Sequence, residues 1–196
     1  MKRQDESEVA DILKSIAVEL SCFNVTADLL AGEHSGFVSW SACRFPDGHH
    51  YGWGGMGEHL LEVVKTCLNM ADFYIERGYQ IDKKLLFIAA LFHDVGKYYD
   101  YEPVGLGTDW DATDHKFKIH HISKGYLIWN QTVDAGKYGF TEEFVEHVSH
   151  CILSHHRAPE WGSPVEPQTM EAVILHHCDS ISASINHIGN KCGKRS

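Results

Sequence analysis

Apolar residues recur along most of this chain at the three- and four-residue spacing of an amphipathic helix. In residues 6–20, Val9, Leu13 and Ile16 lie on one face at that spacing. The same spacing returns over about residues 56–74. We predict a helix for each of these two segments.

The most apolar segment of the chain is the run LLFIAALF at residues 85–92. We predict that this run forms the interior of a helix over residues 82–95, because Asp82 suits the N-cap and a glycine follows the end. A helix that is apolar on all sides is buried. His93 and Asp94, which follow the run directly, are therefore expected at the end of a buried helix.

Three more segments show helical spacing, and the stretches between the helices are rich in glycine, proline and polar residues. The predicted helices span about residues 119–130, 142–155 and 168–187. The predicted loops span residues 32–57, 98–114 and 157–167. There is no strand pattern longer than a few residues and no internal repeat. The sequence therefore predicts an all-α fold.

Length and composition indicate one domain with a sizeable core. The chain has 196 residues, of which 43% are hydrophobic. No run approaches the length that crosses a bilayer, and the N-terminus lacks the apolar stretch of a secretory signal. The six cysteines form no C-x-x-C pair, which fits reduced thiols. We expect a cytoplasmic protein that has no membrane partner.

The formal net charge of −10 bears on the kind of substrate. A surface that follows nucleic-acid phosphates needs clustered Lys and Arg, so the charge argues against a broad surface of that kind. A small or short phosphorylated substrate is easier to accommodate. Bound metal ions would cancel part of the negative charge locally.

His93 and Asp94 are the strongest candidates for chemistry. An unpaired carboxylate is costly to bury at the end of an apolar run, and a metal ion would supply the missing countercharge. Imidazole and carboxylate ligands suit divalent metals, and an Asp beside a His can bridge two ions. The alternative is chance, since the chain has 15 histidines. Further residues of metal-ligand type are His59, His121, His155 and Asp179.

Four strings of the sequence resemble one known family. They are HHYGWGGMGEHLLEVV, LLFIAALFHDVGKYYDY, HHISKG and ILSHHRAPEWGSPVEPQTMEAVILHHCDS. Their order H…HD…H…HH…D resembles the HD-domain superfamily of metal-dependent phosphohydrolases, and it is most similar to the HD domain of the YhaM-type 3′→5′ exoribonucleases. The resemblance covers about residues 48–185. It implies a single HD domain over residues 1–196, a helical bundle with an N-terminal helix within residues 1–31 and a metal-binding core in residues 48–187.

The resemblance also implies a set of metal ligands. His59, His93, Asp94 and Asp179 match the ligands that most of the superfamily shares. His121 and His155 match the additional histidines of the two-metal members, in which Asp94 would bridge the ions. The expected cofactors are therefore two divalent ions, drawn from Mn, Fe, Co, Ni or Zn. The neighbours His120 and His156 would take the places of the additional histidines if the match slipped by one residue.

Three residues are expected to act in catalysis. They are Asp94, Lys97 and His50. Lys97 resembles a lysine that relatives direct toward substrate oxygens, where a cation stabilises the phosphoryl transition state; the alternative is a surface lysine that caps the helix end. His50 would protonate a leaving oxygen or contact phosphate. Its alternative is packing against Tyr51 and Trp53.

Other residues beside these strings are expected to contact the substrate or to hold the ligands in place. They are His156, Arg157 and Glu58. Arg157 would add a cation for a compact anionic substrate, whereas Glu58 also suits the first turn of a helix, where it stabilises the dipole. Loop aromatics would either stack on a nucleobase or close the core. They are Trp40, Phe45, Trp53 and Trp110.

The residues and the resemblance together predict a metal-dependent hydrolase. It would cleave phosphoester bonds of nucleotides or short oligonucleotides through a metal-bound hydroxide, as a 3′→5′ exonuclease, nucleotidase or phosphodiesterase. YhaM-type enzymes carry a nucleic-acid-binding domain ahead of the HD domain, where this chain has a short predicted helix, so extended nucleic-acid binding is expected only with a partner domain. The alternatives are a di-iron oxygenase and a non-catalytic nucleotide-binding protein. The apolar first helix would be a dimer face if the core left it uncovered.

Overall fold

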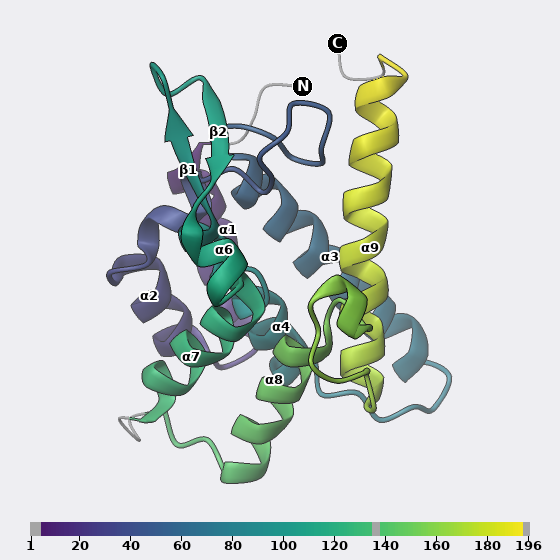
Figure 1. Cartoon of the computed structure of the whole chain (residues 1–196). Coiled ribbons are helices and arrows are strands. Elements are labelled where there is room, and N and C mark those ends of the chain that lie inside the picture. The colour runs from purple at the N-terminus through teal and green to yellow at the C-terminus, as the bar shows by residue number, and fades with distance from the viewer. Residues whose placement is uncertain (1–4, 135–137, 194–196) are drawn as a thin grey trace.

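The computed structural model describes residues 5–134 and 138–193, and within them the fold is helical with one small hairpin (Figure 1). The helices are α1 (Glu6–Glu19), α2 (Phe23–Ala31), α3 (Gly55–Ile75), α4 (Lys83–Phe92), α5 (Lys97–Asp100), α6 (Asp114–Lys118), α7 (His121–Asp134), α8 (Glu142–Ser154) and α9 (Met170–Lys191). Two 3₁₀ turns, η1 (Ser35–Ser39) and η2 (Pro159–Trp161), and two strands, β1 (Tyr101–Val104) and β2 (Asp109–Ala112), complete the described elements. The predicted all-α class is confirmed.

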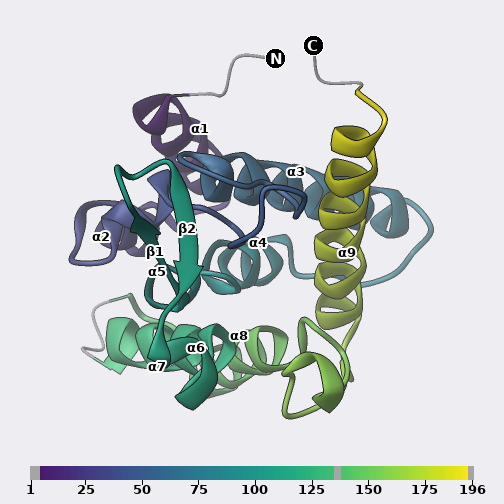
Figure 2. The same cartoon turned by 45° about the horizontal axis from the view of Figure 1, so that its top comes forward.

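Helix α4 lies at the centre of the bundle. Every side chain from Leu85 to Phe92 is buried, and α3, α7, α8 and α9 all pack against this helix. Figure 2 shows α4 between α3 on one side and α7 and α8 on the other. Asp82 caps the helix as predicted, because its carboxylate accepts the backbone N–H of Leu85 at 2.9 Å. The apolar run therefore forms the innermost part of the core.

The N-terminal segment contains two helices, not the single helix predicted within residues 1–31. Helix α1 stops because Ser21 adopts a positive φ of 56° and the N–H of Cys22 returns to the carbonyl of Ala17 at 2.8 Å. The chain then re-enters helix as α2, which packs against α1. The apolar stripe of α1 is covered by the core, so the condition for a dimer face on this helix is not met.

Residues 98–114 are not the loop that the sequence predicts. They form α5, the start of α6 and an antiparallel hairpin in which Tyr101 pairs with Ala112. Each strand has four residues, which is too short for alternation to stand out in the sequence. The hairpin turn contains Gly105 and Gly107, both with positive φ.

The long segment before α3 is ordered by aromatic packing. The rings of Trp40, Trp53 and Trp110 lie 5.0–5.4 Å apart, and the indole N–H of Trp40 donates to the carbonyl of Tyr101 at 2.7 Å. These three indoles tie the segment to the hairpin, which fits the core-closing alternative. Phe45 lies outside this cluster and is half exposed.

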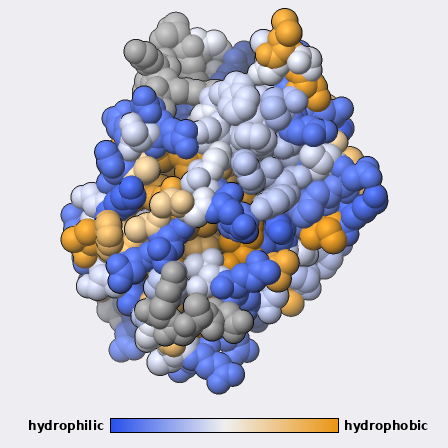
Figure 3. Space-filling model, turned by 90° about the vertical axis from the view of Figure 1, so that its left-hand side faces the viewer, coloured by the Kyte–Doolittle hydropathy of each residue, from blue (hydrophilic) through white to orange (hydrophobic). Residues whose placement is uncertain are grey.

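Two further features of the structure concern membrane-spanning helices and the state of the cysteines. None of the helices in the described residues is long and apolar enough to cross a membrane. All six cysteines are free thiols, as the absence of a C-x-x-C pair predicted. On the face viewed in Figure 3, hydrophobic side chains gather in several patches separated by hydrophilic ones.

The central position of α4 gives a test of the fold. Phe87 on α4 is fully buried, whereas Phe117 on α6 is 73% exposed. Phe87→Ala should lower the free energy of unfolding by about 3–5 kcal/mol, because it leaves a cavity that the packed core fills only partly. Phe117→Ala is the matched control and should change the free energy by less than about 0.5 kcal/mol. Urea denaturation measures both, and equal effects would contradict the described core.

Candidate metal centre

The residues of metal-ligand type converge around Asp94 in the interior of the bundle. His93 is the C-cap of α4, and Asp94 follows it. The others arrive from four different helices: His59 from α3, His121 from the first position of α7, His155 from the end of α8 and Asp179 from α9. All six residues are buried, and the most exposed of them, Asp179, is 7% exposed. Segments far apart in the sequence therefore meet in one buried place.

One oxygen of Asp94 belongs to a first group made of His59, His93, Asp94 and Asp179. Nε2 of His59 lies 3.3 Å from Oδ2 of Asp94 and 3.1 Å from Oδ1 of Asp179. Nε2 of His93 lies 3.4 Å and 3.9 Å from the same two oxygens. The ligand atoms of the first group fit around one ion, because all lie within 4.8 Å of one another.

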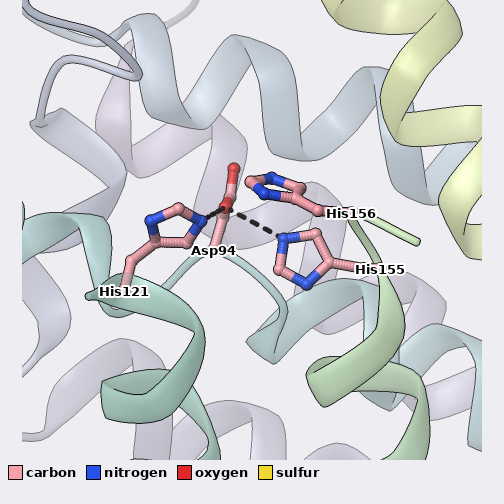
Figure 4. A group of neighbouring side chains, drawn as sticks. All are labelled: Asp94, His121, His155 and His156. Carbon is pink, nitrogen blue, oxygen red and sulfur yellow. Dashed lines mark ion pairs between the residues drawn. The ribbon is translucent and has the colours of Figure 1, made fainter. Parts of the chain in front are cut away.

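The other oxygen of Asp94 faces a second group made of Asp94, His121, His155 and His156. Nε2 of His121 lies 3.5 Å and Nε2 of His155 lies 3.7 Å from Oδ1 of Asp94 (Figure 4). His156 stands beside them, with its Nε2 4.0 Å from Oδ2 of Asp179. The carboxylate of Asp94 is thus shared by two groups.

The five histidines of these groups use the outward ring nitrogen, Nδ1, to hold the imidazole in place. The partners of Nδ1 are Ser182 Oγ for His59 (3.0 Å), the carbonyl of Ala90 for His93 (2.7 Å), Asp100 Oδ2 for His121 (3.0 Å), the carbonyl of Ile152 for His155 (2.7 Å) and the carbonyl of Trp161 for His156 (2.7 Å). A carbonyl accepts a hydrogen bond, so Nδ1 of His93, His155 and His156 must carry a proton. When such a ring is neutral, Nε2 is left with a free lone pair, as a metal ligand requires.

The inward atoms of the two groups are unsatisfied. Within the described residues, Asp94 Oδ1 and the Nε2 atoms of His59, His93, His121 and His155 are buried and have no hydrogen-bond partner. Buried polar atoms without partners are rare in folded proteins, and several at one point call for an ion or water. The donor set of imidazole nitrogens and carboxylate oxygens fits divalent metals. The residues present therefore fit a pair of such ions.

The charges of the site favour the binding of cations. Burial would raise the pKa of Asp94, but Lys97 and His93 beside it hold that pKa well below its usual range. Burial lowers the pKa of His121 far below its usual value, and it lowers the pKa of His156 to about 3, so both rings stay neutral. Burial also acts to lower the pKa of His59, but Asp179 and Asp94 raise it to about 9. The two carboxylates therefore attract positive charge to this point.

Lys97 is buried, so the alternative of a surface lysine is wrong. Its side chain lies at the start of α5, and its Nζ is 2.6 Å from Oδ2 of Asp94. Burial disfavours its charge, but Asp94 and Asp179 raise the pKa above its usual value. The ammonium therefore remains charged beside the shared carboxylate.

His50 and His49 lie beside His59 and are not members of the two groups around Asp94. The side chain of His50 is buried, and its Nε2 lies 3.1 Å from Oε2 of Glu62. Glu62 also accepts the hydroxyl of Ser182, whose oxygen contacts His59. His50 therefore helps to hold Glu62 and Ser182, which position His59. Its neighbour His49, which the sequence did not single out, brings its ring to 5.1 Å from the ring of His59.

The remaining sequence candidates are not members of the two groups around Asp94. Arg157 is exposed and has a positive φ of 72°, and Glu58 is partly buried in the first turn of α3. The ring of His120 lies against that of His121 in a tilted arrangement, with 4.1 Å between ring centroids, and His120 groups with Asp100, not with Asp94. His121 is therefore the member of its pair that faces Asp94, whereas His155 and His156 both do.

Sequence reasoning missed the residues that hold the ligands from behind. They are Asp100, Glu62 and Ser182. Asp100 was assigned to a loop, and the two others are ordinary polar residues on amphipathic helices. Ser182 lies three positions after Asp179 on α9, which is the one signal that could have pointed to it.

Curated relatives of this chain carry the name 3′-5′ exoribonuclease YhaM. The protein from Bacillus licheniformis is 29% identical over 185 residues, which cover 92% of this chain and 55% of the relative. Those from Bacillus subtilis and Listeria monocytogenes are 27% and 28% identical, with 92% and 93% of this chain and 55% and 56% of the relative covered. This chain therefore spans about half the length of these relatives. No solved structure matches it significantly.

The family model of the HD domain matches residues 56–184, which is well over half of the 196-residue chain. The matched range begins in the first turn of α3 and ends within α9, so it contains both groups around Asp94. The matched range, the histidine and aspartate side chains that it brings together and the helical fold agree, and this chain belongs to the HD domain family.

Proposed function

We propose that this protein is a metal-dependent phosphohydrolase that cleaves phosphoester bonds of nucleotides or short oligonucleotides. The observation that carries the proposal is the shared carboxylate of Asp94, with unsatisfied imidazole nitrogens on both sides. The similarity to proteins named 3′-5′ exoribonuclease favours a nucleic-acid 3′ end as the substrate. The net charge of −10 and the buried position of the groups favour a short or small one.

The first and the second group would each hold one divalent ion, and Asp94 would join both. Bound there, such ions would supply positive charge that neutralises a phosphoryl group, and they would lower the pKa of bound water. The protein side chains fix where this happens, because Nδ1 of each histidine is held by a defined partner. No protein nucleophile is needed in this arrangement.

Lys97 would act on the substrate once metal ions balance the charge of Asp94. Its ammonium lies 2.6 Å from Oδ2 of Asp94, so it can reach an anionic oxygen bound at the same place. A fixed cation aimed at developing charge stabilises the transition state more than the ground state. His49 would contact the phosphate or leaving group from the side of His59. Its ring and that of His50 lie 5.1 Å and 5.0 Å from the ring of His59, but Nε2 of His50 already lies 3.1 Å from Glu62.

The substrate class can be tested by adding metal-loaded protein to a panel of substrates. We expect release of mononucleotides from the 3′ end of short RNA, with Mn²⁺ or Co²⁺ added to metal-free protein. RNA with a blocked 3′ end should resist cleavage, while nucleoside phosphates and cyclic dinucleotides distinguish the nucleotidase and phosphodiesterase variants. Two bound irons with oxygen consumption and no hydrolysis would point to an oxygenase instead. Nucleotide binding without turnover would point to a non-catalytic protein.

The shared carboxylate gives the sharpest test of the two-metal site. Asp94→Asn should remove both ions and bring hydrolysis to background, because the amide lacks the charge that joins the two groups. Asp111→Asn is the control, since this exposed carboxylate lies on the hairpin beside Arg44. Mass spectrometry of gently purified protein measures metal per chain. Full metal content in the Asp94 variant would contradict the assignment.

The role of Lys97 in catalysis can be tested separately from metal binding. Lys97→Met should lower kcat by about 10²–10³-fold with metal content unchanged, because a transition-state cation is lost. Lys118→Met should behave like the wild type, since Lys118 is exposed and pairs with Asp114. Steady-state kinetics with metal analysis on the same samples gives both values. A variant that loses only metal and recovers full kcat at high metal concentration would show that Lys97 has no role in the chemical step.

A further inference from the structure

The outward contacts of the five grouped histidines differ in charge. His93, His155 and His156 donate to backbone carbonyls, and His59 contacts a hydroxyl. His121 is different, because its Nδ1 lies 3.0 Å from a carboxylate oxygen, Oδ2 of Asp100. Hydrogen bonds to an ionised acceptor are roughly twice as strong as neutral ones. The second group therefore contains a ligand with a charged support that the first group lacks.

Asp100 is built into the fold as a rigid support. Its side chain is fully buried at the end of α5. Besides the ring of His121, Oδ2 accepts the backbone N–H of the same residue at 3.1 Å, and Oδ1 lies 2.9 Å from Nδ1 of His115. The carbonyl of Asp100 accepts the N–H of Thr113 at 3.0 Å. One residue thus holds the starts of α6 and α7 against α5.

The backbone of His121 is also closely packed, so the point from which the imidazole starts is fixed. A Cβ atom added to Gly96 would lie 2.2 Å from the carbonyl oxygen of His121. Only glycine allows the turn after Asp94 to approach α7 this closely. The backbone of His121 is therefore held by its packing against Gly96, and its ring is held by Asp100.

We propose that Asp100 is a positioning residue that sets the metal affinity of the second group through His121. A carboxylate behind Nδ1 fixes the ring and strengthens Nε2 as a donor, and loss of such a partner weakens metal binding by about 10–100-fold. The first group depends instead on Ser182, which supports His59. The inference rests on the proposed two-metal site, and it adds that the two ions are controlled separately.

The test is a titration of metal-free protein with Co²⁺, followed by absorption and calorimetry. Wild type should show two binding events. Asp100→Asn should weaken one of them by about 10–100-fold, and this should be the event that His155→Ala removes. Ser182→Ala should weaken the other event, which His93→Ala removes. Asp114→Asn is the control for loss of an acidic charge nearby, because Asp114 is exposed at the start of α6.

The outcomes separate this inference from the proposed function. If wild type binds no Co²⁺, the two-metal site itself is wrong. If wild type and the Asp100 variant both bind two ions equally well, only the role of Asp100 is wrong. If wild type binds a third ion that the Asp100 variant alone loses, then Asp100 is a ligand, together with His120, and the inference is overturned.

A measurement on unaltered protein covers the case in which the Asp100 variant does not fold. In the Zn²⁺-loaded wild type, proton NMR should place the Nδ1–H signal of His121 further downfield than those of His93 and His155, because its acceptor is a carboxylate and theirs are carbonyls. Equal shifts for the three histidines would overturn the inference.

Discussion

A carboxylate at the bottom of a hydrophobic core is the constraint around which this protein is organised. Asp94 is 1% exposed and follows the most deeply buried helix, so its charge must be balanced by what surrounds it. Lys97 supplies one positive charge at 2.6 Å. Imidazole nitrogens lie on both sides of the carboxylate, where they would hold metal ions that supply further positive charge. The need to balance this charge links the core of the fold to the chemistry of the site.

The helical bundle meets this need by delivering side chains from many directions. Four helices pack on α4, namely α3, α7, α8 and α9. Each of them brings a residue of metal-ligand type to the C-terminal end of α4. Behind the histidines, carbonyls, a hydroxyl and the carboxylate of Asp100 fix the rings. A centre assembled in this way needs the whole bundle, so its geometry and the stability of the fold depend on the same contacts.

Much of the fold followed from local patterns, because helices in this chain bury one face or all faces and show it in their spacing. α3, α4 and α8 lie close to where the periodicity placed them, and the cap at Asp82 was predicted from the sequence. The hairpin and α2 were not, since four-residue strands and a break at one serine leave little pattern. Contacts among Trp40, Trp53 and Trp110 decide that region.

The sequence by itself determined the helical class, the burial of His93 and Asp94, and the set of residues with ligand chemistry. Only the tertiary structure decided how the paired histidines divide their roles. His50, His120 and Arg157 have positive φ values, so the direction of the side chains at these pairs depends on turns that spacing does not encode. The same holds for Asp100, which reaches His121 across 21 residues of chain. Residue type is local information, whereas the partner of each ring nitrogen exists only after the helices have packed.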